Sequence, residues 1–339
     1  MCISDSRTPA RVLRNITLPL FSPHILGSCL LVCLFTLNSF DIPDILRVRV
    51  LSVEIFIQLA AMYDEAGALF MSMPLLAFVL LLTLIIQRSM RGKIYFGFSA
   101  AQDRIFLTEK RYRLIGFFLL GTIWILSVAL PCILFISAIP SIEIFCRSLS
   151  SADNELLYST ILASLCALTI LICSIPSAYL LARRHKFQSL VDFFTLVPLA
   201  VPAALFSLGL IKAANFLDLQ FLSSSSLFCL MGLAAHFLFL GVKILQTGIE
   251  QVDFQAEEAA FITGTSRAGV LSKIILPQTK ASIATAFFLV FICCFSELSA
   301  TLLLVPPGRE TIAVKIYNLM HYGADDMVAS LCLFIIIVM

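Results

Sequence analysis

Residues 248–282 read GIEQVDFQAEEAAFITGTSRAGVLSKIILPQTKAS, and this polar segment lies between two long apolar stretches, residues 226–247 and 283–304. Each flanking stretch is long enough to cross a bilayer as a helix, since about 20 apolar residues span the hydrocarbon core. The segment itself is too polar to cross. The pattern therefore predicts a membrane protein in which residues 248–282 form a loop at one membrane face.

The 248–282 loop carries signals for two short helices. Ala256–Phe261 consists mostly of good helix formers, and Gly264 suits a tight turn because glycine tolerates a positive φ. A second helix is predicted over Ser266–Ile275, and Pro277 should end or bend it. Such a helix–turn–helix is a candidate docking element for a partner protein. The alternative is an amphipathic connection that lies among the lipid headgroups.

The composition of the whole chain supports the membrane interpretation. Of the 339 residues, 60% are hydrophobic and 13% are charged, whereas soluble domains carry about 25% charged residues. A helix satisfies its own backbone hydrogen bonds in lipid, so the apolar stretches predict an all-α, polytopic membrane protein with about eight transmembrane helices. The predicted spans are residues 20–40, 66–86, 114–137, 156–181, 191–211, 226–247, 283–304 and 324–339.

The cysteines and the net charge exclude other classes of protein. Nine of the 11 cysteines lie in apolar stretches, where cysteine behaves as a small hydrophobic residue, and no CxxC pair occurs. The sequence therefore predicts neither a disulfide framework nor a metal site. The net charge of +2 gives no support to nucleic-acid binding.

Basic residues are distributed unevenly between the two sets of alternating loops. One set holds 16 lysines and arginines and the other holds six. Because cytoplasmic loops carry the excess of basic residues, we assign the first set to the cytoplasm. That set includes the N-terminus and the 248–282 loop. It also includes residues 87–113, which are predicted to be a basic cytoplasmic linker between two membrane units.

Polar side chains inside the predicted spans are candidate functional groups, because burying them in lipid is costly. Glu297 and Asn38 are candidate pathway residues, and the alternative for Glu297 is an interhelical hydrogen bond. His236 suits a helix–helix hydrogen bond better than a role as a ligand. Lys243 is close enough to the end of its span to extend toward the headgroups.

The 248–282 loop also contains a sequence signature. Its residues match the pattern E-A-A-x3-G-x9-I-x-L-P at every specified position, with Glu258, Ala259, Ala260, Gly264, Ile274, Leu276 and Pro277. In this respect the chain resembles ABC-importer permeases of the MetI-like superfamily. The resemblance implies that Glu257 to Gly264 insert into a groove of an ATPase subunit, with Glu258 paired to a basic residue there. It also implies that Leu276 and Pro277 set the angle into the next span.

An internal repeat divides the chain. Residues 13–19 (LRNITLP) align with residues 271–277 (LSKIILP), and the register continues to the pair Asp64 and Asp325. The repeat places Ile16, Leu18 and Pro19 as the first unit's remnant of the coupling signature.

The repeat and the resemblance together predict a domain organisation. Residues 1–86 are expected to be the C-terminal part of a first permease unit with two spans. Residues 114–339 are expected to be a second unit with six spans and a MetI-like permease core. This arrangement resembles fused, two-unit permeases of the Fe(III) importer type, which carry further spans before the position of Met1. We therefore expect a chain that is incomplete at its N-terminus.

The resemblance implies a multi-pass permease of the bacterial inner (cytoplasmic) membrane that works by alternating access. No GxxxxGK[ST] phosphate loop occurs, so the chain is predicted not to be an enzyme and to need no cofactor. The expected partners are a dimer of cytoplasmic ABC ATPase subunits, the lipid bilayer and a periplasmic solute-binding protein. Tyr317, His321 and Tyr322 are candidate contacts for that binding protein.

Ferric iron is the expected substrate. Thiamine, a phosphonate, a sugar phosphate or sulfate are alternatives that use the same machinery. Two other classes stay open: a secondary transporter driven by an ion gradient and an inactive, truncated remnant of a split reading frame.

Overall fold

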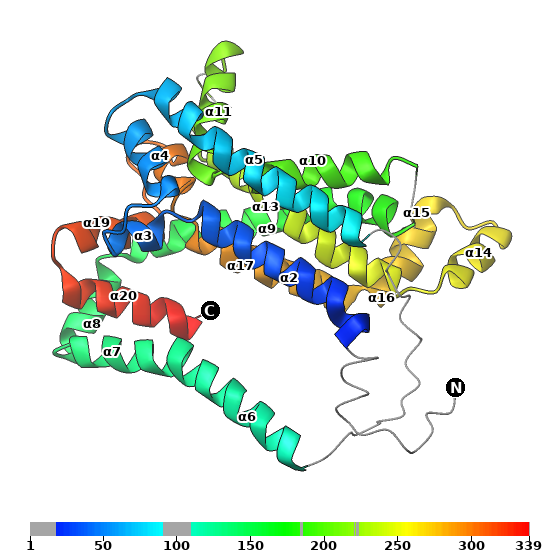
Figure 1. The fold of residues 1–339 in the computed structure, drawn as a ribbon, viewed down its shortest axis with the longest axis horizontal. Coiled ribbons are helices and arrows are strands. Elements are labelled where there is room, and N and C mark those ends of the chain that lie inside the picture. The colour runs from blue at the N-terminus through cyan, green and yellow to red at the C-terminus, as the bar shows by residue number, and fades with distance from the viewer. Residues whose placement is uncertain (1–17, 91–109, 184–185, 220, 222–223, 339) are drawn as a thin grey trace. The chain divides into compact units, whose positions relative to one another are not determined.

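The computed structural model describes residues 18–90, 110–183, 186–219, 221 and 224–338, and within these ranges every regular element is a helix (Figure 1). The all-α prediction is thereby confirmed for the described part of the chain. The helices form two compact units. The first contains the described residues of 1–99 and 162–307, and the second contains those of 100–161 and 308–339.

Three helices are long and apolar enough to cross a membrane, or up to five if two bent helix pairs each count as one span. The three are Leu114–Ala138, Asp153–Ala182 and Ser226–Glu250. Ile25–Asn38 and Glu65–Leu81 are shorter apolar helices. The predicted count of eight spans is therefore not confirmed by helix length and composition in the described residues.

Two predicted spans are interrupted. The span predicted over residues 191–211 consists of α10 (Gln188–Ala200) and α11 (Ala203–Phe216), which meet at a 102° bend. Pro202 lies at this bend, and proline lacks the N–H that a continuous helix needs. The span predicted over residues 283–304 ends early, because α17 (Lys280–Ser296) stops before Glu297 and a short helix, α18 (Thr301–Leu304), follows.

The described residues of the first compact unit include two apolar cores. In one, α13 (Ser226–Glu250) packs along α17, and buried residues of α9 (Asp153–Ala182) complete the core. Val270 and Ile275 from the 248–282 loop are part of the same core. The other core joins α2 (Leu18–Asn38), α4 (Leu51–Ala60) and α5 (Glu65–Met90) to α11.

In the second compact unit, α20 (Asp325–Val338) packs on α7 (Leu130–Ala138) and α8 (Ile142–Ser150). Helix α19 (Ile312–His321) is fixed at its start by the Ser159 hydroxyl, which accepts the Ile312 N–H at 2.7 Å. Lys315 forms an ion pair with Glu155 at 2.6 Å. Helix α6 (Lys110–Trp124) continues into α7 through a π-helical turn, η2 (Ile125–Ala129).

The order of helices recurs along the chain in the two segments that the sequence repeat aligns. A long helix, two shorter helices and a long helix occur as α2, α3 (Asp41–Ile45), α4 and α5, and again as α17 to α20. The aligned residues Ala68 and Ala329 are both buried, in α5 and α20. Most of the predicted linker at residues 87–113 lies outside the described residues, and its first and last four residues are helical.

Candidate functional site

Between the end of α13 at Glu250 and the start of α17 at Lys280, the 248–282 loop contains two short helices joined by a glycine turn. Helix α14 (Phe254–Ile262) follows Asp253, whose side chain accepts the Gln255 N–H at 3.0 Å. Gly264 adopts a φ of +83°, as expected for a left-handed turn position. Helix α15 (Arg267–Val270) then starts at Ser266, whose hydroxyl accepts the Gly269 N–H at 3.2 Å.

A sharp bend joins this helix pair to α17. Helix α15 continues as a π-helical turn, η3 (Leu271–Ile275), and a short helix, α16 (Leu276–Gln278). Residues 267–278 and 280–296 meet at 75°. Pro277 lies in this segment, and both the backbone N–H and the hydroxyl of Thr279 donate to the Ile275 carbonyl at 2.9 Å. Pro277 thus lies immediately before the bend, where the sequence predicted that a helix ends or bends.

Helix α14 places its two adjacent glutamates, Glu257 and Glu258, on different faces. Glu258 and Ala259 are exposed, and next to them Phe261 and Ile262 expose 42% and 86% of their surfaces. Glu257 is completely buried. The two adjacent glutamates therefore face opposite environments, which the prediction of one continuous inserted segment from Glu257 to Gly264 did not anticipate.

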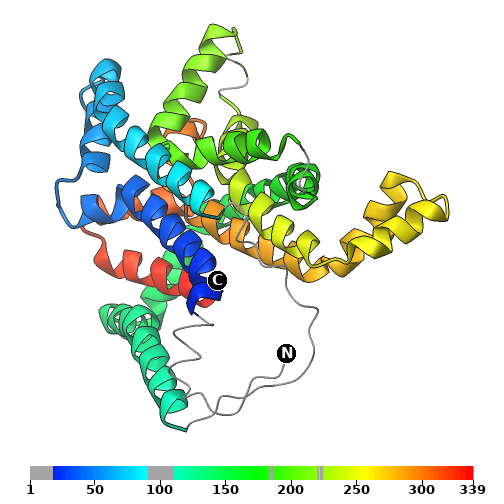
Figure 2. The same cartoon turned by 45° about the vertical axis from the view of Figure 1, so that its right-hand side comes forward.

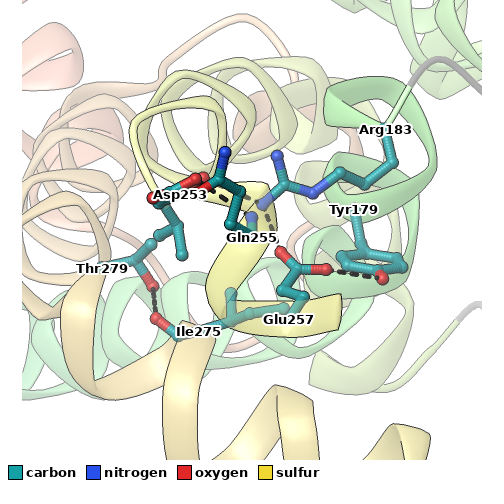
Figure 3. Close-up of polar contacts among 8 residues, drawn as sticks. Tyr179, Arg183, Asp253, Gln255, Glu257, Ile275 and Thr279 are labelled. Atoms are coloured by element: carbon teal, nitrogen blue, oxygen red, sulfur yellow. Dashed lines mark hydrogen bonds and ion pairs between the residues drawn. The ribbon is translucent and has the colours of Figure 1, made fainter. Parts of the chain in front are cut away.

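The buried carboxylate of Glu257 lies between two side chains from the end of α9 (Figure 3). It forms an ion pair with Arg183 and accepts a hydrogen bond from the Tyr179 hydroxyl at 3.1 Å. The same guanidinium donates to the Val252 carbonyl at 3.2 Å, and it lies 5.6 Å from the ring centroid of Phe254. Sequence reasoning missed Tyr179 and Arg183. Their spacing of four residues at the end of an apolar helix was the available signal.

The remaining signature residues flank the bend. Ile274 and Ala260 are partly buried against the α9–α13–α17 core. Leu276 is half-buried, and Pro277 is exposed. In the first half of the chain, Leu18 is exposed on the first turn of α2, and Pro19 is exposed beside it. Ile16 lies outside the described residues.

The candidate pathway residues have separate partners. Glu297 accepts the Ala300 N–H at 3.1 Å, so its hydrogen bond stabilises the turn between α17 and α18 and does not join two spans. Asn38, at the end of α2, donates to the Leu199 carbonyl at 3.0 Å. Leu199 lies in the last turn of α10, where helix carbonyls lack intrahelical partners. Asn38 thus stabilises the break between α10 and α11.

Other polar groups contribute to the same helix packing. Ser299 donates to Asp41 at 3.1 Å, and burial raises the pKa of the Asp41 carboxyl, an effect that this hydrogen bond opposes. His236 is buried against the rings of Phe206 and Phe237. Lys243 forms an ion pair with Asp192 of α10 at 2.5 Å, a partner that sequence reasoning missed.

The remaining candidates lie near the end of α19. Tyr322 exposes 86% of its surface, and the rings of Tyr317 and His321 lie 4.5 Å apart. Within the described ranges, no group of three or more His, Cys, Asp or Glu residues is arranged to hold a metal ion. Figures 1 and 2 show α14 and α15 extending beyond the ends of α13 and α17.

Comparison with protein families gives this loop its context. Residues 170–339, half of the chain, match the family described as the inner membrane component of binding-protein-dependent transport systems. The chain belongs to this family. The matched region includes the 248–282 loop, both bent helix pairs and α20. The resemblance drawn from the loop signature is therefore confirmed.

Curated relatives include permeases named for different solutes. An Fe(3+)-transport system permease protein of Haemophilus influenzae is 24% identical over 88% of this chain, and the chain spans 60% of that relative's length. A molybdate/tungstate transport system permease protein of Thermococcus kodakarensis is 26% identical over 63% of this chain and 87% of the relative. A putative 2-aminoethylphosphonate transport system permease protein of Salmonella typhimurium is 27% identical over 53% of this chain and 68% of the relative.

Proposed function

We propose that this chain is the membrane subunit of an ATP-driven importer, and that α14 and α15 dock into a groove of a cytoplasmic ABC ATPase subunit. The exposed face of α14 carries this proposal. It places two large apolar side chains, Phe261 and Ile262, beside the carboxylate of Glu258. Apolar side chains suit a groove on a partner, and an exposed charge fixes the register of the bound helix.

We propose ferric iron as the substrate, delivered by a periplasmic solute-binding protein. The support is the match to the Fe(3+)-transport system permease protein, which covers 88% of this chain. The molybdate/tungstate and phosphonate permeases match shorter parts, 63% and 53%. Family membership alone does not select the solute.

We also propose that the chain consists of the end of one permease unit, residues 1–86, a linker and a second unit, residues 114–339, with the N-terminus in the cytoplasm. The recurring helix order of α2 to α5 and α17 to α20 supports the division. The excess of basic residues in one set of loops supports the orientation.

Substituting Gly264 tests the docking proposal. Gly264→Asp introduces a side chain at a φ of +83° and a negative charge on the docking surface, so ATPase binding should be lost while membrane insertion continues. The matched control is Gly308→Asp, because Gly308 has a φ of +84° and, as at Gly264, an added Cβ would meet no atom within 4 Å. The measurement is co-purification of the cognate ATPase with the full-length permease. Wild-type yield of the ATPase with Gly264→Asp contradicts the proposal.

Uptake into proteoliposomes tests the substrate and the energy source. The complete complex should accumulate radiolabelled ferric iron only with ATP and the solute-binding protein. Molybdate and 2-aminoethylphosphonate serve as competing solutes. Accumulation driven by an ion gradient in the absence of ATP identifies a secondary transporter instead.

A further inference from the structure

Helix α14 is attached to the rest of the first compact unit by a buried polar cluster as well as by the backbone. Among the helices, α14 packs chiefly on α15. Beyond that contact, Glu257 is bonded to Tyr179 in the last turn of α9 and to Arg183, the residue directly after α9 (Figure 3). Arg183 also holds Val252 and Phe254, which flank the start of α14. We call Tyr179, Arg183 and Glu257 the α9 clamp.

Burying the charges of the α9 clamp costs hydration free energy, so each of its three side chains depends on the others for compensation. Glu257 is completely buried, and the Arg183 side chain is 16% exposed. A buried charge is tolerated when a partner and hydrogen bonds compensate for lost hydration, and removing one partner leaves the other uncompensated. The contact therefore resists separation of α14 from α9.

Besides the packing of Val270 and Ile275 in the apolar core, two connections run from α14 to the helices. One runs through the bend at Pro277 into α17. The other is the α9 clamp, in which Arg183 and Glu257 lie 74 positions apart in the sequence. The ion pair between Glu257 and Arg183 makes the end of α9 follow a displacement of α14, whereas without this contact α14 can move more independently of α9.

We propose that the α9 clamp transmits movement of the docking helix α14 to α9, with Glu257 acting as a positioning residue that never touches the ATPase. The inference rests on the proposed docking of α14 and adds a second route of coupling to it. The two neighbouring glutamates then have different roles. Glu258 faces the ATPase, and Glu257 holds α14 to α9.

The adjacent glutamates supply a matched pair of variants, Glu257→Gln and Glu258→Gln. The full-length permease is assembled with its cognate ATPase in nanodiscs, and ATP with vanadate is added to trap the ATPase in its closed state. Hydrogen–deuterium exchange is then followed in the last turn of α9, residues 179–182, and in α17.

We expect Glu257→Gln to retain the ATPase while the nucleotide-induced change in exchange at residues 179–182 falls by about tenfold, a typical size for coupling between sites. The change in α17 should persist, since the bend at Pro277 is intact. Glu258→Gln should instead weaken ATPase binding. A wild-type response of α9 in Glu257→Gln overturns the inference, as does a loss of ATPase binding equal to that of Glu258→Gln.

Tyr179→Phe provides the second variant if Glu257→Gln does not fold. It removes one hydroxyl and preserves the ion pair, so the α9 response should fall by a smaller factor with full ATPase retention. An unchanged α9 response in Tyr179→Phe then counts against the clamp. Failure of the wild-type chain to bind the ATPase refutes the proposed function itself, which keeps the two failures distinguishable.

Discussion

Gly248 allows the end of α13 to approach the start of α17. A Cβ at this position would overlap the side chain of Ser282 and lie 3.7 Å from a methyl group of Thr279. Gly248→Val should therefore force the two helices apart and lower the free energy of unfolding by about 1–3 kcal/mol, the usual cost of overpacking. Thermal unfolding of the purified permease in detergent measures the change.

Gly209→Val is the control for this substitution. Gly209 lies in α11, and a Cβ there meets no atom within 4 Å. It should leave the midpoint of unfolding close to that of the wild type. Equal midpoints for Gly248→Val and the wild type would show that α13 and α17 are not in close contact at this position.

At the level of single residues, the exposed residues of the candidate site could be predicted from the sequence better than the buried ones. The signature identified Glu258 and Gly264, and the glycine has the positive φ that the turn requires. It could not separate Glu257 from Glu258, because no periodic apolar pattern in so short a helix defines an inward face. Arg183 is distant in sequence, so only the fold brings it to Glu257.

At the level of elements, the π-helical turns η2 and η3 of the described residues occur in the same sequence context. Each is followed by a Leu-Pro pair, with Pro131 after η2 and Pro277 after η3. Proline removes a backbone N–H and clashes with the carbonyl four residues earlier. Widening the preceding turn moves that carbonyl away, so the helix continues with one extra residue in the turn.

Pro277→Ala should remove the cause of the π turn in the loop. The segment then returns to α-helical geometry, which rotates α14 and α15 by about 100°, one residue of helix, relative to α17. We expect the ATPase still to bind the exposed face of α14. ATP-driven uptake of ferric iron should fall by about tenfold, because the rotated α14 then displaces α17 in the wrong direction.

Pro131→Ala is the matched control, since it relieves the same kind of turn in the helix that runs from α6 to α7. Its uptake should stay near that of the wild type. Equal uptake by the wild type and Pro277→Ala would show that the geometry of the bend does not set the direction of coupling.

Apolar composition located most helices but not their breaks. The stretch 226–247 became the single helix α13, whereas the stretch 191–211 is broken near Pro202. Hydropathy measures how well a segment dissolves in lipid, and it contains no information on where the backbone changes direction. The break between α10 and α11 is stabilised by Asn38 from α2, which lies 161 positions from its partner Leu199 in the sequence.

At the level of the whole molecule, the proposed orientation makes the 248–282 loop and the α19–α20 turn lie on opposite faces of the membrane. One predicted span, residues 283–304, separates the 248–282 loop from α19 along the chain. The distribution of basic residues favours the cytoplasmic side for the loop. Both places offer an exposed glycine turn with a positive φ, at Gly264 and Gly323. A short epitope inserted beside either glycine should therefore be tolerated.

Antibody binding to sealed vesicles measures this topology. The epitope beside Gly264 should be accessible only in inside-out vesicles, and the epitope beside Gly323 only in right-side-out vesicles. Detergent permeabilisation, which exposes both, is the control for epitope integrity. Accessibility of both epitopes from the same side would mean that the chain does not cross the membrane between α16 and α19. In that case the force that α14 receives from an ATPase would have no continuous helical route through α17 to the opposite face, and the proposed alternating-access mechanism would fail with it.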